Sequence, residues 1–170
     1  MGSATQEDRV LVLPYDPGRL PTMHRSRPGE SIQLDVLGLP PFKDTSFSIR
    51  NPKHRHYTRF LALRTAALEA MGDRAWSHGP IGLDFDLFAS AVDPRRDLLD
   101  YVSGVMDTLD GSHGMDFSYL PIVYNDDFQV CEVVSRFHQS ASERYVVRIT
   151  FLPNKSPVPI CSTPPDRYGG

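Results

Sequence analysis

The sequence predicts a mixed α/β (α+β) domain in which a small mixed or antiparallel sheet packs against two main helices. Apolar residues make up 40% of the 170 residues and charged residues 23%, a composition typical of a globular chain that can bury one core. Two stretches repeat apolar residues at helical spacing, and five short apolar runs are bounded by turn residues. We expect one domain over residues 1–152 and a proline-rich tail over residues 153–170.

The five apolar runs predict strands at residues 10–13, 32–37, 80–90, 128–137 and 145–152. The third run alternates most clearly, with apolar residues at every odd position from Ile81 to Ala89. The turn-forming residues 139–143 join the last two runs, so we expect those two strands to form an antiparallel hairpin. Cys131 lies in an apolar run and is expected to be a small core residue.

Helical spacing predicts the two helices at residues 53–71 and 94–110. Gly72 follows the first helix in the position where glycine commonly ends one, and Gly111 follows the second. In the second helix, apolar residues gather on one face, and acidic residues lie opposite with Gly104 among them. The apolar set is Leu98, Val102, Val105 and Leu109, and the acidic set is Asp97, Asp100 and Asp107.

Charge and composition limit the classes of function. No apolar run approaches the roughly 20 residues that cross a bilayer, and residues 1–10 contain no apolar signal region. Cys131 and Cys161 form neither a metal-binding spacing nor a disulfide framework, so we expect a soluble cytoplasmic protein. A net charge of −3 argues against a protein that coats duplex DNA, but it allows a local basic patch.

Two acidic points predict a metal site. One is the acidic helix face, where no lysines follow the acids at a spacing of four, and where Asp97 lies in the first turn. The other is Asp126 and Asp127, directly before a strand. A solvated helix face and an ordinary turn are the alternatives. Together, carboxylates from a helix start and a strand start would suit Mg²⁺, with Mn²⁺ as a substitute.

A basic segment precedes and enters the first helix. A solvated helix start is one interpretation, and a surface that tracks DNA phosphates is the other. A zinc site at His54 and His56 lacks a third ligand, and a serine hydrolase lacks a Gly-x-Ser-x-Gly motif. The candidate DNA-binding residues of this segment are Arg50, Lys53, Arg55, Arg59 and Arg64.

From about residue 81 to residue 152, the sequence resembles the RusA family of Holliday-junction resolvases. That family carries Asp-x-Asp-Asn-Leu-x-Lys-x-x-x-Asp-x-Leu on a helix and then Asp-Asp-x-Gln-Val before a strand. The second motif is complete here as Asp126-Asp127-Phe128-Gln129-Val130, whereas the first matches only at Asp97, Asp107 and Leu109. Its second aspartate falls on Leu99, its asparagine on Asp100 and its lysine on Ser103.

The resemblance implies a Mg²⁺-dependent endonuclease that resolves Holliday junctions or related branched DNA as a homodimer, with no membrane and no organic cofactor. It implies Asp97 and Asp127 as catalytic metal ligands, with Asp126 beside them. We add Asp100 as a substitute carboxylate, and Arg95, Arg96 or His113 as candidates for the charge of the missing lysine. Arg95 and Arg96 also join the candidate DNA-binding residues. The alternatives are a RusA-like module that binds DNA structures or proteins without cleavage, and a nuclease for another nucleic acid.

Overall fold

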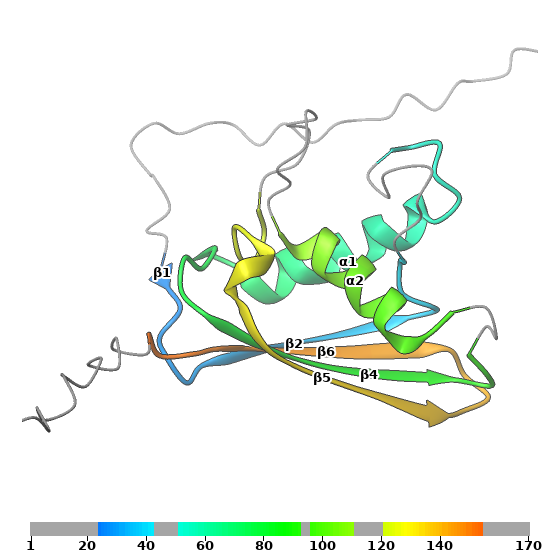
Figure 1. Cartoon of the computed structure of the whole chain (residues 1–170). Helices are drawn as coiled ribbons and strands as arrows, with labels where there is room; N and C mark the ends of the chain where they lie inside the picture. The colour runs from blue at the N-terminus through cyan, green and yellow to red at the C-terminus, as the bar shows by residue number, and fades with distance from the viewer. Residues whose placement is uncertain (1–23, 43–50, 93–95, 111–120, 155–170) are drawn as a thin grey trace, which may run out of the picture.

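The computed structural model describes residues 24–42, 51–92, 96–110 and 121–154. Within these ranges, two helices lie on one side of a four-stranded mixed sheet (Figure 1), which confirms the predicted fold class. The strand predicted at residues 10–13, together with Arg50, Arg95, His113 and Cys161, lies outside the described residues. The strand order is β2-β6-β4-β5, and the bounds are Ser31–Leu37 (β2), Ile81–Ala89 (β4), Val130–Gln139 (β5) and Arg144–Phe151 (β6).

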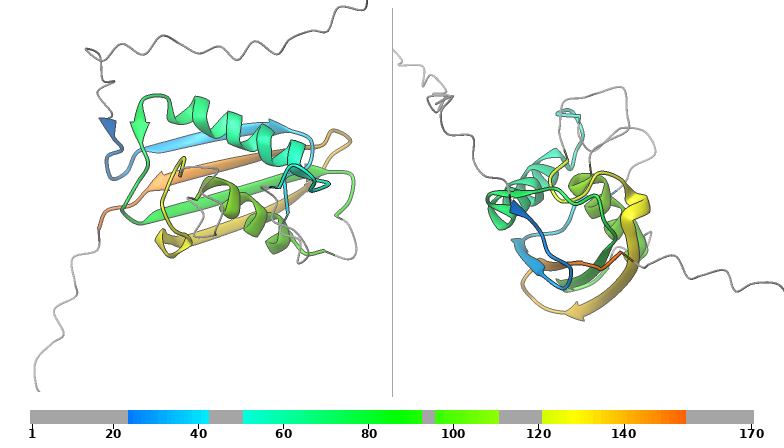
Figure 2. Two further views of the ribbon diagram at one scale, coloured as in Figure 1. Left: turned by 90° about the horizontal axis from the view of Figure 1, so that it is seen from above. Right: turned by 90° about the vertical axis from the view of Figure 1, so that its left-hand side faces the viewer.

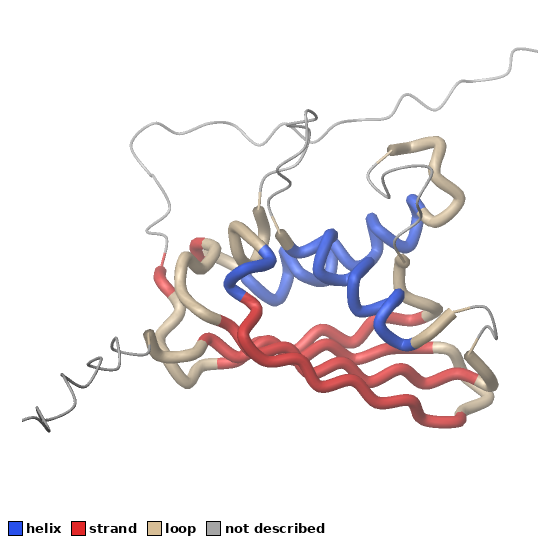
Figure 3. Tube along the Cα trace, in the orientation of Figure 1, coloured by secondary structure: helices blue, strands red, loops and turns tan. Residues whose placement is uncertain are grey.

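Alternation places the core on the helix-facing side of the sheet. Every second residue of β2 is buried, and β4 and β6 follow the same pattern. The helices α1 (Tyr57–Met71) and α2 (Leu98–Leu109) cover this side, as Figure 3 shows. Seen from above, α1 lies over β2, and α2 lies over β4 and β5 (Figure 2). A short parallel pair, β1 (His24–Arg25) and β3 (Arg74–Ala75), forms a second sheet.

The helix ends follow local rules. Gly72 ends α1 with a φ of 57°, and its N–H donates to the carbonyl of Leu68, as predicted. Helix α2 begins only at Leu98, because Asp97 has extended backbone and caps the helix with its side chain. Among the described residues, neither helix is long and apolar enough to span a bilayer.

The predicted hairpin between the last two strands is wrong. Strand β4 lies between them, because it pairs with β5 in parallel and with β6 in antiparallel orientation. Residues 140–143 carry the chain past the end of β4, where the N–H of Ser140 donates to the carbonyl of Ala89 over 2.8 Å. The more apolar β4 takes the central position, and β5 becomes an edge strand. Cys131 is consequently exposed rather than part of the core.

Candidate functional site

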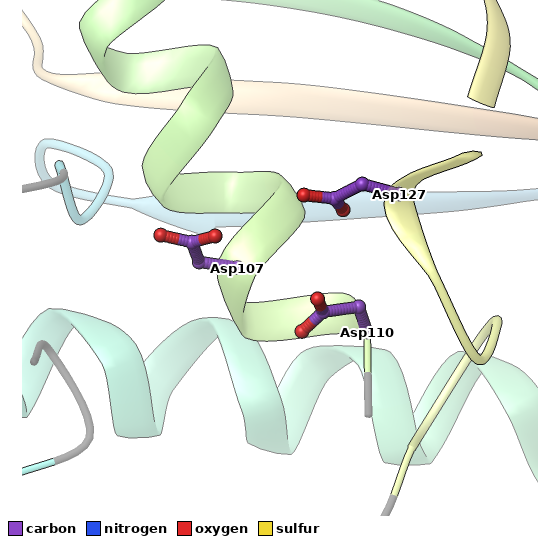
Figure 4. Close-up of side chains that lie close together, drawn as sticks. All are labelled: Asp107, Asp110 and Asp127. Atoms are coloured by element: carbon purple, nitrogen blue, oxygen red, sulfur yellow. The ribbon is translucent and has the colours of Figure 1, made fainter. Parts of the chain in front are cut away.

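Three carboxylates meet at the C-terminal end of α2. Asp107 and Asp110 lie three residues apart, at positions that share one face of a helix. Asp127 begins the short 3-10 helix η1 (Asp127–Gln129), which lies beside that helix end (Figure 4). One carboxylate oxygen from each residue lies within 4.8 Å of the other two. This acidic group offers oxygen ligands of the kind that Mg²⁺ and Mn²⁺ prefer.

Tyr124 supports the acidic group from the core. The side chain is fully buried, and its hydroxyl lies 3.1 Å from the carbonyl oxygen of Met106 and 3.4 Å from Oδ1 of Asp127. Burial raises the pKa of Tyr124 well above 10, and the nearby charge of Asp127 raises it further. The phenol therefore stays protonated, and it donates a hydrogen bond that ties α2 to the segment carrying Asp127.

Gln129 fixes the turn that carries Asp127. Its Oε1 accepts hydrogen bonds from the backbone N–H groups of Asn125 and Asp126, at 2.8 and 3.0 Å. Its Nε2 donates to the carbonyls of Ser77 and Gly79, at 2.9 and 2.8 Å. The side-chain amide thereby joins the acidic turn to the segment before β4. The side chain of Asp126 accepts from the N–H of Phe128 and caps η1, so it has a structural contact of its own.

The predicted set of Asp97, Asp100, Asp126 and Asp127 is not brought together. Asp97 and Asp100 form a capping box at the start of α2, where each carboxylate accepts from the other residue's N–H over 2.9 and 3.3 Å. Ten residues of helix at about 1.5 Å each separate Asp97 from Asp107 by roughly 15 Å. Of the four predicted ligands, the structure therefore places only Asp127 in the acidic group.

The carboxylates that lie close to Asp127 are those of Asp107 and Asp110, whereas the prediction named Asp97 and Asp100. Asp107 was recognised on the acidic face of the helix, but it was not assigned as a ligand. Asp110 was missed. Their spacing of three in the last helical turn was the available signal, since it puts both side chains on one face.

A basic pocket of about 330 Å³ lies near the opposite end of α2. Arg55, Arg59 and Arg96 line it, and none of the described residues lining it is acidic. Phe42 forms an aromatic wall: the guanidinium carbon of Arg96 lies 3.3 Å from the ring centroid, and that of Arg55 lies 5.2 Å away. The remaining lining residues are Leu39, His56, Ala91 and Tyr101.

The charge of this pocket resides on its arginines. Burial is the largest of the causes that lower the pKa of His56 from 6.5 to about 4, and the positive charges of Arg59 and Arg55 add to its effect. His56 is therefore neutral at pH 7. Three clustered guanidinium groups in a concave site suit an anion with several oxygens, such as a phosphate.

The other basic candidates lie apart from the pocket. Lys53 is exposed, and Arg64 is half-buried on α1; neither lines the cavity. His54 is buried, and its Nδ1 accepts from the N–H of His56 over 3.0 Å. Among the described residues, neither histidine belongs to a group of three possible metal ligands, so the zinc alternative gains no support.

No protein-family model matches the chain, and no curated protein matches it significantly. The resemblance to RusA resolvases therefore rests on the motif residues alone.

Proposed function

We propose that the protein is a nuclease that uses Mg²⁺ or Mn²⁺ to hydrolyse phosphodiester bonds in branched DNA. The observation that carries the proposal is the acidic group of Asp107, Asp110 and Asp127, in which one carboxylate oxygen from each residue lies within 4.8 Å of the other two. Three carboxylates this close repel each other, and a divalent cation would relieve that repulsion. Their donor set fits a hard cation and offers no soft ligand.

Residues at the C-terminal end of α2 would bind the metal, and residues near its N-terminal end would bind a phosphate of the substrate. Asp107, Asp110 and Asp127 would hold the cation, which when bound polarises a phosphodiester and lowers the pKa of a coordinated water. Tyr124 would orient Asp127 through its hydroxyl. Arg55, Arg59 and Arg96 would hold a phosphate of the same substrate.

The spacing of the two features supports a polymeric substrate. Roughly 15 Å of helix separates them, which corresponds to about four nucleotides along one DNA strand at about 3.4 Å each. A small phosphate ester would not reach both ends. A local basic pocket on a chain with net charge −3 also favours contact at a defined place over coating of the duplex.

The choice of branched DNA rests on the resemblance to RusA resolvases through the stretch from Asp126 to Val130. Action in the reducing cytoplasm belongs to the same proposal, and the free thiol of Cys131 favours it.

A second candidate function is a module that binds branched DNA without cutting it. The capping box formed by Asp97 and Asp100 favours this candidate, because two acids in the region of the family's metal-binding motif serve the helix start instead. Ser103 in the position of the family's lysine favours it as well. The basic pocket would serve such a module equally.

The deciding experiment incubates the purified protein with a labelled four-way junction and a matched linear duplex, with Mg²⁺, Mn²⁺ or EDTA. We expect metal-dependent cleavage of the junction, which Asp127→Asn and Asp107→Asn abolish while leaving a mobility shift in EDTA intact. Asp97→Asn is the matched control, because it makes the same chemical change at the other end of α2, where asparagine also caps a helix well. Binding without cleavage under either metal would overturn the nuclease proposal in favour of the binding module. Loss of cleavage in Asp97→Asn alone would place the metal at the helix start.

A further inference from the structure

A second cavity, of about 270 Å³, lies at the end of the sheet where β4 begins, at the left of Figure 1. We call it the Trp76 cavity. Residues from three segments line it: the end of β1, the connection between β3 and β4, and the end of β6. None of the described residues lining it is acidic. The polar and aromatic residues among them are Arg25, Ser26, Trp76, Ser77, His78 and Asn154. The volume is about nine times the roughly 30 Å³ that one water molecule takes up in the liquid, which leaves room for a ring of the size of a nucleobase.

Two hydrogen-bonding groups of this lining lack a partner. Oγ of Ser26 and Nε1 of Trp76 are both buried, and neither has a hydrogen-bond partner among the described residues. A buried polar group without a partner is costly to the folded state. The hydroxyl can donate a hydrogen bond, and the indole N–H can do nothing else. A ligand that brings acceptor atoms to these two residues would therefore gain binding energy by supplying the missing partners.

The aromatic residues favour a planar ligand. The rings of Trp76 and His78 lie 6.4 Å apart between centroids and are inclined by 64°, so they meet edge to face rather than stacked. This arrangement leaves ring faces for a third ring, and His78 is exposed at the rim. Exposed aromatic rings of this kind stack on nucleobases of any sequence. The edge of every nucleobase also carries acceptor atoms, which the two unpartnered donors require.

Arg25 connects the Trp76 cavity with a place for a phosphate. It also lines an adjoining cavity of about 410 Å³, in which three arginines outnumber two acidic residues. The arginines are Arg25, Arg27 and Arg74, and the acids are Glu30 and Asp73. A guanidinium group suits the oxygens of a phosphate. A base in the first cavity and its own phosphate at Arg25 would lie as neighbours, as they do within one nucleotide.

Gln129 joins the Trp76 cavity to the turn that carries Asp127. Its Nε2 donates to the carbonyls of Ser77 and Gly79, which line the cavity, and its Oε1 accepts from two N–H groups of the turn. Two hydrogen bonds of about 2.9 Å and one amide group therefore separate the two, a distance of roughly 8 Å. At about 3.4 Å for each nucleotide, this distance corresponds to about two nucleotides.

We propose that the Trp76 cavity binds an unpaired base of the DNA strand, about two nucleotides from the phosphodiester at the acidic group. His78 stacks on the base, Ser26 and the indole N–H of Trp76 donate to its acceptor atoms, and Arg25 holds the adjoining phosphate. A duplex base would have to leave its stack to enter, whereas a strand at a branch point offers unpaired bases at lower cost. The inference rests on the proposed function for its substrate, DNA, but not on cleavage.

Fluorescence tests the inference directly, because Trp76 is the only tryptophan of the chain. The probes are a short single-stranded oligonucleotide and an abasic strand of the same length, each titrated in EDTA until anisotropy of a labelled end shows that it is bound. We expect the normal strand to quench the indole emission in a saturable way and the abasic strand to leave it unchanged. Equal quenching by both strands, or none by either, would overturn the proposal.

Variants assign the effect to the cavity. Ser26→Ala removes one hydrogen bond and should weaken the binding that quenching reports by about fivefold. His78→Ala removes the stacking face and should weaken it by at least about fivefold. Ser142→Ala is the matched control, because Ser142 is exposed at the opposite end of the sheet, between β5 and β6, and this variant should bind as the wild type does. Circular dichroism checks that each variant folds. Wild-type affinity in both Ser26→Ala and His78→Ala would overturn the proposal.

The junction-cleavage assay separates this inference from the nuclease proposal. Base-dependent quenching in a protein that cuts no junction with Mg²⁺ or Mn²⁺ would support the Trp76 cavity and overturn the nuclease. Metal-dependent cleavage by a protein whose emission does not distinguish the two strands would support the nuclease and overturn the base site.

Discussion

Replacement of Gly104 by alanine tests how α2 is seated on the segment that forms the basic pocket. The sequence placed Gly104 among the acids on the polar face, but the structure buries it against Pro41 and Phe42. A Cβ at this position would lie 2.3 Å from the carbonyl oxygen of Pro41 and 2.5 Å from Cα of Phe42. Ordinary contact begins at 3.4 Å, so the two segments must separate by about 1 Å.

Two opposing contributions determine the sign of the effect. Alanine is favoured over glycine in a helix interior by about 1 kcal/mol. Overpacking typically costs about 1–3 kcal/mol, and the upper part of that range applies because the obstructing atoms are backbone atoms. We expect Gly104→Ala to lower the free energy of unfolding by about 1–2 kcal/mol, measured by urea denaturation.

The neighbouring Ser103→Ala provides the control for this experiment. It improves helix propensity by a few tenths of a kcal/mol at a half-buried position, and we expect it to be neutral or slightly stabilising. Because Phe42 contacts Arg55 and Arg96, Gly104→Ala should also weaken binding of DNA at the pocket. A Gly104→Ala protein as stable as the wild type would refute the close approach of α2 to residues 41–42.

Three further predictions concern the acidic group and the pocket. Tyr124→Phe should lower the free energy of unfolding by about 1 kcal/mol, through loss of its hydrogen bonds, and should weaken Mg²⁺ binding measured by calorimetry. Mg²⁺ at a hundred times its Kd should stabilise the wild type by about 2.7 kcal/mol in thermal melts; Asp110→Asn should lose most of this gain, and Asp97→Asn should keep it. The pKa of His56 is lowered to about 4, so the unfolded chain binds more protons between pH 6.5 and 4 and stability falls as the pH falls through that window. His56→Gln should remove part of that fall in the melting temperature, and an identical pH profile would contradict the burial of this histidine.

The helices and strands were predictable because their signals are local. Alternation from Ile81 to Ala89 and the glycine after Met71 each depend on neighbouring residues, and the structure confirms both elements. The order of strands was not predictable in this way. A four-residue connection after Gln139 can close a hairpin, or it can pass the end of another strand. Only the position of β4, fixed by contacts distant in sequence, decides between them.

The candidate metal site was predicted in part, for a similar reason. The motif identified Asp127, and the sequence showed an acidic helix, but neither indicated which end of that helix would lie beside Asp127. The resemblance paired Asp97, the first aspartate of the helix motif, with Asp127 of the second motif, and this pairing placed the predicted site at the start of the helix. A helix of twelve residues is long enough for that choice to matter, since it moves the site by roughly 15 Å.

The complete Asp-Asp-x-Gln-Val match has a structural explanation for most of its residues. Asp126 caps η1, Gln129 joins the turn to residues 77 and 79, and Val130 begins β5 opposite Ile81. A chain that needs this turn would keep these residues with or without catalysis, so the match alone says little about metal. Asp107 and Asp110 carry more information, because they come from a different element and meet Asp127 only in the folded chain. The proposed activity therefore depends on whether these two aspartates bind a cation, and substitutions of them are more decisive than substitutions within the motif.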